Sequence, residues 1–342
     1  MGGAEGSVKA LVTGGGGFLG RYIVEKLLAR GDSVRVLGRG IYPELEKLGA
    51  ETVRADLRDA NAVNRACEKM DVAFHVAALP AVWGKWQDFY SINVEGTQNV
   101  LAGCKAQGVS RLVYTSTPSV VFDQSDLCNI DESYPYPKSY NCYYPESKAV
   151  AERLVIGTNG KDGLYTTSLR PHLVWGPRDN HLIPRVLQRA KERQLFIVGD
   201  GRNRVDITYV ENAADAHLQA ADHLNAGSPV AGQVYFISQG EPVVLWDFIN
   251  QLLAGLGIPQ IRKAISYDAA RSIGAVLELV YKVFSLRGEP RMTRFLAAQL
   301  AKSHYFDISK ARRDFGYEAR ISTREGLERL VAYLGRPSPS GT

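Results

Sequence analysis

One pair of residues in this chain has the types and the spacing that acid–base chemistry requires. A tyrosine and a lysine four residues apart lie one turn apart on a helix, so we expect the ammonium to favour the phenolate and to lower the pKa of the phenol. This matters because an unperturbed tyrosine has a pKa of about 10 and is a poor acid or base at neutral pH. The spacing occurs three times, at Tyr22/Lys26, Tyr134/Lys138 and Tyr144/Lys148.

Local context selects the third copy. Two prolines fall inside the second copy and exclude a regular helix there. The first copy lies on a helix whose apolar side must pack on a sheet, so we interpret it as structural. The third copy begins a helix predicted over residues 144–156, with Pro145 in the tolerated first turn. We therefore predict that Tyr144 and Lys148 are catalytic.

A cluster of hydroxyls ends another predicted strand. Arg111–Thr115 runs directly into Ser116 and Thr117. Ligands of open α/β sheets bind at the carboxyl ends of the strands, and a hydroxyl there can stabilise an oxygen on which negative charge develops.

A glycine-rich turn follows the first apolar stretch of the chain. The pattern predicts a strand over Val8–Val12 and a helix over Arg21–Arg30, which is the context that a dinucleotide-binding turn requires. The first amides of such a helix can bind a pyrophosphate. The residues predicted to hold the dinucleotide here are Gly14, Gly17, Phe18, Leu19 and Gly20.

The residues after the second predicted strand indicate which dinucleotide is bound. An acidic residue there would accept hydrogen bonds from a ribose 2′-OH, whereas an arginine suits a 2′-phosphate. Here Gly38 and Arg39 follow the strand, and no acidic residue stands at that position. We predict that the cofactor is NADP(H), with NAD(H) as the alternative. Two alternatives for Arg39 stay open: it could be an ordinary solvated charge of the loop, and Arg35 or Arg21 could contact the phosphate instead.

The whole chain alternates between strand and helix patterns, which predicts an α/β fold of the Rossmann type: a doubly wound parallel sheet of about seven strands with a smaller C-terminal α/β lobe. We assign residues 7–175 plus about 205–240 to the nucleotide-binding domain and about 176–204 plus 241–335 to the substrate-binding lobe, with flexible ends at 1–6 and 336–342. The predicted strands are Val8–Val12, Ser33–Leu37, Thr52–Ala55, Val72–Val76, Arg111–Thr115, Tyr165–Leu169 and Val234–Ser238.

Composition excludes several functions. The chain has 342 residues, 45% of them apolar, and a net charge of +5 without a basic run, so no nucleic-acid surface is predicted. Its four cysteines form no C-x-x-C pair and no secretory leader is evident, so we expect reduced thiols in the cytoplasm. The six histidines lack metal-ligand spacing, so no metal site is predicted, and we interpret His75 as a core residue.

The segment 272–286 is apolar nearly throughout, yet it contains Glu278 and Lys282 at helical spacing. It is too short to cross a bilayer, which takes about 20 apolar residues. It could be a core helix, a lid over an apolar substrate, or a helix in peripheral contact with a membrane surface.

With these features placed, the chain resembles the extended short-chain dehydrogenases/reductases of the 3β-hydroxysteroid dehydrogenase type over residues 8–330. The resemblance implies that Thr117 holds the reacting oxygen, with Ser116 as the alternative. It also implies that Asn93 belongs to the proton relay, unless it is a helix cap, and that Asp56 accepts from the adenine, unless it only caps a turn. Further residues that it places near the cofactor are Leu57, Ala77, Pro171 and Val174.

The resemblance narrows to bacterial reductases of long-chain olefin biosynthesis. It is carried by segments such as Ala81–Gly84, Asn93–Val100 and Tyr114–Val121. It implies NADPH-dependent reduction of the 3-keto group of a long-chain 2-alkyl-3-oxoalkanoic acid, a homodimer, and assembly with other enzymes of that pathway. The alternatives are a 3β-hydroxysteroid or sterol dehydrogenase, which could also remove a C4 carboxylate, a nucleotide-sugar epimerase or dehydratase, and a non-catalytic cofactor sensor.

Overall fold

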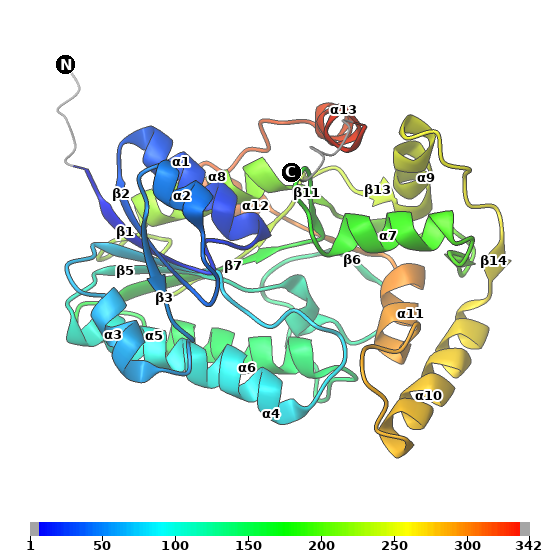
Figure 1. Ribbon diagram of the computed structural model, residues 1–342, viewed down its shortest axis with the longest axis horizontal. Coiled ribbons are helices and arrows are strands. Elements are labelled where there is room, and N and C mark those ends of the chain that lie inside the picture. The colour runs from blue at the N-terminus through cyan, green and yellow to red at the C-terminus, as the bar shows by residue number, and fades with distance from the viewer. Residues whose placement is uncertain (1–6, 336–342) are drawn as a thin grey trace.

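Seven parallel strands form the central sheet of the computed structural model, which describes residues 7–335 (Figure 1). Their order across the sheet is β12-β7-β5-β4-β1-β2-β3. The predicted fold class is confirmed. The predicted flexible ends, 1–6 and 336–342, lie outside the described residues. The strands are β1 (Lys9–Thr13), β2 (Ser33–Gly38), β3 (Glu51–Arg54), β4 (Val72–His75), β5 (Arg111–Thr115), β7 (Tyr165–Pro171) and β12 (Val234–Ile237).

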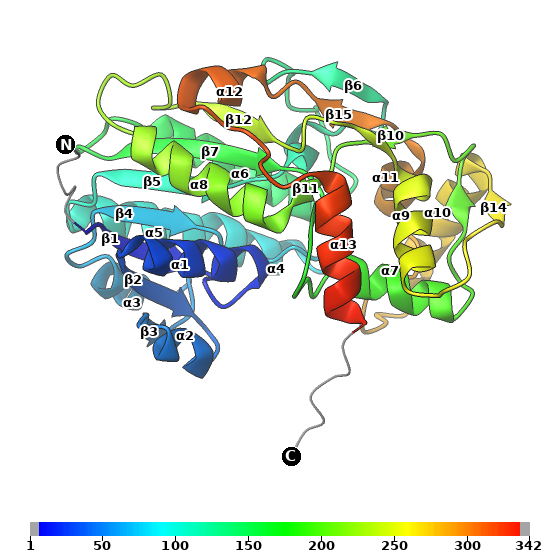
Figure 2. The same ribbon diagram turned by 90° about the horizontal axis from the view of Figure 1, so that it is seen from above.

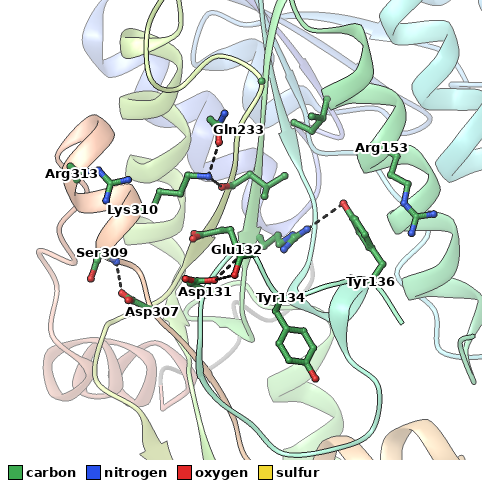
Figure 3. Close-up of a pocket in the computed structure, with 15 residues that line it drawn as sticks. Asp131, Glu132, Tyr134, Tyr136, Arg153, Gln233, Asp307, Ser309, Lys310 and Arg313 are labelled. Carbon is green, nitrogen blue, oxygen red and sulfur yellow. Dashed lines mark hydrogen bonds between the residues drawn. The ribbon is translucent and has the colours of Figure 1, made fainter. Parts of the chain in front are cut away.

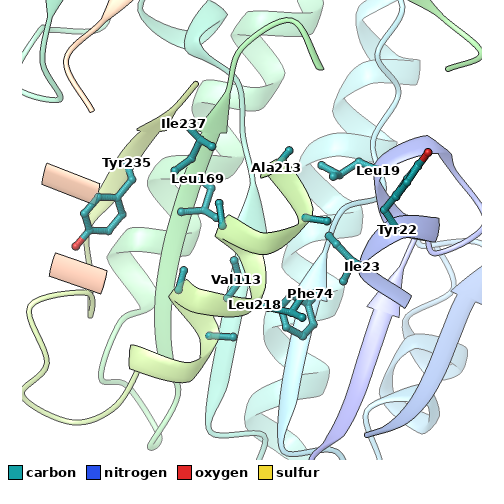
Figure 4. Close-up of a cluster of buried hydrophobic side chains, with 14 of the residues drawn as sticks. Leu19, Tyr22, Ile23, Phe74, Val113, Leu169, Ala213, Leu218, Tyr235 and Ile237 are labelled. Atoms are coloured by element: carbon teal, nitrogen blue, oxygen red, sulfur yellow. The ribbon is translucent and has the colours of Figure 1, made fainter. Parts of the chain in front are cut away.

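Helices cover both faces of this sheet (Figure 2). Successive side chains of a strand point to opposite faces, so Val113 packs under one helical layer and Leu112 under the other. Figure 4 shows the first layer, in which α1 and α8 pack on the strands through side chains such as Ile23 and Leu218. One face has α1 (Phe18–Arg30), α8 (Val210–His223) and α12 (Ser309–Phe315); the other has α3 (Ala60–Ala66), α5 (Gly96–Ala106) and α6 (Tyr143–Thr158).

A second sheet, of order β13-β10-β15-β6, begins the other lobe. Strand β6 belongs to this sheet, although its residues fall in the range that we assigned to the nucleotide-binding domain. Conversely, α12 falls in the range that we assigned to the substrate-binding lobe, yet it packs on β12 and α8. The strands of this sheet are β6 (Leu127–Ile130), β10 (Arg204–Val205), β13 (Val243–Val244) and β15 (His304–Phe306), and two further strand pairs are β8 (Val174–Trp175) with β11 (Thr208–Tyr209) and β9 (Ile197–Val198) with β14 (Ala264–Ile265).

The remaining helices lie mostly around the second lobe. They enclose a separate apolar core centred on Trp246 and Trp175. The α-helices are α2 (Pro43–Lys47), α4 (Trp86–Phe89), α7 (Leu182–Lys191), α9 (Leu245–Gly255), α10 (Tyr267–Val283), α11 (Arg294–Ala301) and α13 (Thr323–Leu334); a π-helix covers Tyr90–Glu95 and a 3₁₀ helix covers Pro118–Val121.

Helix α10 contains most of the apolar segment 272–286, and its arrangement corrects one interpretation. The core-helix interpretation is wrong, because Val276 is 60% exposed and Leu279 is 61% exposed. The helix packs instead through a face of small and polar residues, where Gly274 lies so close to α11 that a Cβ would meet backbone atoms of Thr293 at 2.7 Å. Within residues 7–335, no helix is long and apolar enough to cross a membrane.

The carboxylate of Glu278 holds α10 to α11. It accepts the backbone N–H of Arg294 at one oxygen and Nε of Arg294 at the other, both at 2.7 Å. The predicted i,i+4 partner Lys282 is therefore not the cation that Glu278 contacts. A carboxylate that accepts two such hydrogen bonds explains how the helix packs with its apolar side outward.

We expect Glu278→Ala to lower the free energy of unfolding by about 1–3 kcal/mol, because a helix N–H loses its acceptor. Leu279→Ala on the exposed face is the matched control and should change it by less than about 0.5 kcal/mol. Thermal denaturation of both variants measures the difference. Equal losses would contradict this packing.

Candidate active site

Tyr144 and Lys148 lie on the first turns of α6, beside the carboxyl end of β5. The helix begins after Cys142, whose extended backbone starts it, and Pro145 occupies the first turn without costing a hydrogen bond. The other two copies of the motif do different things. Tyr22 donates to a backbone carbonyl while Lys26 pairs with an aspartate of α8, and Tyr134 and Lys138 lie in the loop before α6.

The ammonium of Lys148 is buried and fixed in place. Only 2% of the residue is exposed, Nζ donates to the carbonyl of Thr115 at 2.6 Å, and it lies 4.1 Å from the centre of the Tyr114 ring. Burial lowers the pKa of Lys148 to about 7, and the charge of Glu152 opposes that shift. Its proton can therefore be gained or lost near neutral pH.

Tyr144 differs from the prediction made for its pKa. Burial raises the pKa of Tyr144 to about 12, and the hydroxyl of Thr117 only partly offsets this. The predicted lowering by Lys148 does not appear, because its ammonium is bound to Thr115 on the strand. A raised pKa keeps the phenol protonated, which is the form that can donate a proton to a ketone oxygen.

Thr117 and Ser116 point to different partners. The Thr117 hydroxyl contacts Tyr144 and also accepts the N–H of Ser119 at 3.2 Å, since Thr117 caps the short 3₁₀ helix. Ser116 lies on the side of Glu152, whose pKa is lowered against its burial chiefly by Arg170, with a smaller contribution from the Ser116 hydroxyl. Of the two candidates, the structure therefore brings Thr117 together with Tyr144.

Asn93 is buried inside the π-helix, so its interpretation as a helix cap is wrong. Its Nδ2 donates to the hydroxyl of Ser147 at 2.9 Å, and its Oδ1 accepts the N–H of Leu79 at 2.7 Å. Ser147 in turn donates to the carbonyl of Tyr144 at 2.9 Å. Asn93 thus joins the segment after β4 to the helix that carries the tyrosine. Sequence reasoning missed Ser147, which is one residue from Lys148.

His75 links the same region to the glycine turn. Its Nδ1 lies 2.7 Å from the hydroxyl of Thr13, and its Nε2 lies 2.9 Å from the hydroxyl of Thr97, which donates to the carbonyl of Asn93. Both ring nitrogens are satisfied, as expected for a core histidine. Burial, followed by the charge of Lys148, lowers the pKa of His75 to about 3, so it is neutral at physiological pH.

A buried ion pair supports the inner end of α6. Glu152 lies two turns beyond Tyr144 and accepts hydrogen bonds from Arg170, Tyr136 and Ser168. The Arg170 Nη2 to Glu152 Oε1 distance is 2.6 Å, and both side chains are almost fully buried. Sequence reasoning missed this pair. The four-residue spacing from Lys148 to Glu152 was the available signal.

The glycine turn has the close packing that dinucleotide binding needs. Gly14 has φ +69°, and a Cβ there would meet the backbone of Ala77 at 2.8 Å. A Cβ on Gly20 would meet the carbonyl of Gly14 at 2.2 Å. Among residues 7–335 no side chain caps the first turn of α1, and that turn has no acidic residue, so its amides can bind an anion. This turn fits the pyrophosphate of the predicted cofactor.

Arg39 lies beside this turn with its side chain exposed. Arg21 and Arg35 are both held in ion pairs, whereas within residues 7–335 Arg39 makes no side-chain hydrogen bond or ion pair. Arg54 donates to the carbonyl of Arg39 at 3.2 Å, so two cations meet here. The ring of Tyr42, which sequence reasoning missed, packs against the glycines on both sides of Arg39 and fixes this loop.

Asp56 and Leu57 follow the end of β3. Both oxygens of Asp56 accept from the guanidinium of Arg58, at 2.9 and 2.8 Å, and this pairing lowers the pKa of Asp56 to about 2. Asp56 also accepts the N–H of Arg58, which is the predicted turn contact. Leu57 is buried, and its side chain lies where a Cβ on Gly96 would meet it.

The segment after β7 contains Pro171 and Val174. Pro171 is buried at the end of the strand and Val174 is half-buried in β8. Between them His172 contacts His304 of the second sheet at 2.6 Å, and Leu173 takes φ +39°. This strained turn joins the two lobes at the sheet edge where ligands of this fold bind.

A separate polar cavity of about 660 Å³ has Arg170 of the Glu152–Arg170 ion pair in its lining (Figure 3). Glu132 and Lys310 line it together with Arg170 and Tyr136. None of the predicted catalytic residues is among its lining residues, so it is not the reacting centre.

Glu152→Leu should lower the free energy of unfolding by about 3–5 kcal/mol, because it leaves the Arg170 charge buried without a partner. Adding Arg170→Met should restore much of that loss, since both charges are then gone. Chemical denaturation of the single and double variants tests this. A double variant that loses the sum of both single effects would contradict it.

The sequence of this chain is similar to those of several known proteins. The family model of the 3-beta hydroxysteroid dehydrogenase/isomerase family matches residues 11–266. The chain is 46% identical to a 2-alkyl-3-oxoalkanoate reductase of Stenotrophomonas maltophilia over 95% of this chain and 99% of that protein. It is also 46% identical to one of Shewanella oneidensis, covering 95% and 86%. A mouse sterol-4-alpha-carboxylate 3-dehydrogenase, decarboxylating, is 34% identical, covering 94% and 90%.

Solved structures show the same fold. MoeE5 in complex with UDP-glucose and NAD has a TM-score of 0.73 and 26% identity, covering 95% of this chain and 98% of that one. A short-chain dehydrogenase/reductase superfamily protein of Agrobacterium tumefaciens with bound NAD has a TM-score of 0.74 at 20% identity, covering 95% and 97%.

The matched residues contain the glycine turn, Tyr144 and Lys148, and the relatives are named as reductases and dehydrogenases. The sensor interpretation is therefore set aside. The chain belongs to the 3-beta hydroxysteroid dehydrogenase/isomerase family, and it is an NAD(P)-dependent oxidoreductase.

Proposed function

We propose that this protein uses NADPH to reduce the 3-keto group of a long-chain 2-alkyl-3-oxoalkanoic acid to the 3-hydroxy acid. The observation that carries the proposal is the 46% identity, over nearly the full length of both chains, to a reductase named for that substrate. The juxtaposition of Tyr144, Thr117 and Lys148 supports it, because these residues are the groups that ketone reduction requires.

In this reaction several residues of the chain have separate roles. Bound NADPH would supply hydride to the carbonyl carbon. Tyr144 donates its phenolic proton to the carbonyl oxygen, and Thr117 donates a hydrogen bond to that oxygen as it becomes negative. Lys148, whose pKa of about 7 lies near ambient pH, is placed one turn away to return a proton towards the phenolate. Asn93 and Ser147 hold the start of α6 so that the phenol keeps its position.

The cation pair at Arg39 and Arg54 supports the choice of NADPH over NADH. Two exposed arginines beside the glycine turn suit a 2′-phosphate, and the second strand ends without an acidic residue. NADH remains the alternative cofactor, as NAD is bound in the solved structures of similar fold.

A sterol or steroid dehydrogenase is the second candidate, favoured by the 34% identity to the mouse sterol-4-alpha-carboxylate dehydrogenase. One assay separates these functions. Oxidation of NADPH is followed with a 2-alkyl-3-ketoacid, a 3-ketosteroid and a nucleotide sugar at equal concentration. Turnover of the ketoacid alone supports the proposal, and turnover of the steroid alone overturns it.

Tyr144→Phe should reduce turnover at least about 100-fold, because the proton donor is lost. Binding of NADPH should stay within about twofold of the wild type, since the ring shape is unchanged. Initial rates and a fluorescence titration with NADPH measure the two effects. A variant with wild-type rates would remove Tyr144 from the mechanism.

Arg39→Ala should weaken NADPH binding about tenfold or more and leave NADH binding nearly unchanged, because only NADPH has the 2′-phosphate that Arg39 would contact. The control is Arg324→Ala on α13, where 90% of the arginine side chain is exposed, and it should alter neither affinity. Dissociation constants for both dinucleotides give the comparison. Equal losses for NADPH and NADH would assign phosphate recognition to another residue.

A further inference from the structure

Helix α10 leaves a row of apolar side chains uncovered. Within residues 7–335, eleven large apolar side chains are exposed, and six of them lie between Ile273 and Leu286. Single exposed apolar residues are ordinary on a protein surface, whereas a contiguous group marks a contact surface. We call four of these residues the α10 face: Val276, Leu279, Val283 and Phe284, which are 60%, 61%, 65% and 70% exposed.

The spacing of these residues puts them on one side of the helix. Val276, Leu279 and Val283 follow one another at intervals of three and four residues, and Phe284 comes directly after the last of them. The opposite side of α10 holds it to α11 through Gly274 and Glu278. The α10 face is therefore not used by the fold, and a partner can reach it without any rearrangement.

The exposed charges along this stretch are mostly positive. From Tyr267 to Arg291 they comprise one acid, Asp268 in the first turn of α10, and four bases, Arg271, Lys282, Arg287 and Arg291. The remaining carboxylates of the stretch are paired within the fold, Glu278 with Arg294 and Glu289 with Arg185. An apolar helix face with basic residues beside it complements an anionic lipid surface.

Aromatic contacts connect α10 to the helix of the candidate active site. Tyr281 of α10 meets Trp83 edge to face, with 6.3 Å between the ring centres. The next residue back along the chain, Val82, accepts a hydrogen bond from Cys142 at the start of α6. The α10 face therefore lies on an element that is in contact, through one loop, with the helix that carries Tyr144.

Other occupants of the α10 face fit it less well. In a two-fold contact between copies of this chain the same patch meets itself, so Lys282 and Arg287 would be brought towards their own copies. A helix that crosses a bilayer needs about 20 apolar residues, whereas α10 has 17 residues in all. A helix that lies in the plane of the membrane needs only one apolar side and basic residues near the headgroups.

We propose that the α10 face rests on an anionic lipid bilayer. The four apolar side chains enter the boundary between headgroups and acyl chains, and the basic residues lie at the level of the lipid phosphates. The contact is peripheral, with α10 parallel to the membrane surface. It does not depend on the proposed reaction, because it is read from the surface of the protein alone.

Co-sedimentation of the full-length protein with vesicles tests the proposal. Vesicles of equal parts phosphatidylglycerol and phosphatidylcholine should bind the wild type at least about tenfold more tightly at low salt than vesicles of phosphatidylcholine alone. About 1 M salt should remove most of that difference, because it screens the charges.

Two variants separate the apolar part from the charged part. Leu279→Asp should weaken binding to the anionic vesicles about tenfold or more, because it places a carboxylate among acyl chains. Lys282→Gln should weaken it about fivefold and leave binding to phosphatidylcholine unchanged. The matched control is Leu48→Asp, where 52% of the residue is exposed beside α2 at the other end of the molecule (Figures 1 and 2), and it should change binding less than about twofold. All three variants should keep the wild-type Kd for NADPH, which shows that they are folded.

Three results would overturn the proposal. The first is a wild type that does not bind the anionic vesicles, and the second is a Leu279→Asp variant that binds them as the wild type or the Leu48→Asp control does. The third comes from sedimentation velocity: if Leu279→Asp reduces the size of the wild-type oligomer and vesicles bind neither protein, the face is a contact between copies of the chain. None of these measurements involves turnover, so their outcome is independent of the substrate assay.

Discussion

The site depends on a buried ammonium that is held by residues of strand β5. Lys148 is removed from water, and its Nζ is held by the carbonyl of Thr115 and the face of the Tyr114 ring. A buried charge without such partners would cost several kcal/mol. The contact therefore fixes the position of α6 along β5. Because Tyr144 lies one turn earlier on the same helix, the same contact also sets where the phenol lies relative to Thr117.

The carboxylate of Glu152 helps to stabilise the buried ammonium of Lys148. It lies one turn beyond Lys148, keeps the pKa of that lysine from falling further, and is itself neutralised by Arg170. One face of α6 thus presents a phenol, an ammonium and a carboxylate in turn. These polar groups are buried or half-buried, so their protonation is governed by their burial and by neighbouring groups of the fold.

Much of the fold follows from local sequence, and so does part of the site. All seven central strands were predicted within two residues at either end, because both faces of a parallel sheet are buried and need continuous apolar runs. The start of α6 was predicted from its proline and spacing. The sequence could not show that Glu152 pairs with Arg170, because the two residues are on different elements, or that Tyr42 packs over the loop of Arg39.

Helix α10 shows why an apolar pattern alone misleads. Burial is decided by what a neighbour offers, and α11 offers a backbone N–H that the carboxylate of Glu278 accepts, with space for nothing larger than Gly274. Satisfying that N–H turns the apolar residues outward.

The protonation of Tyr144 bears on the direction of the reaction. Oxidation of an alcohol requires a phenolate to receive the proton, whereas reduction requires a phenol to give it. Burial raises the pKa of Tyr144 to about 12, so near neutral pH the phenol form dominates before any charge from a cofactor acts. The Thr117 hydroxyl offsets this shift only in part, and the Lys148 ammonium is bound to Thr115. The geometry thus favours a proton donor, which agrees with the arginines that suit NADPH.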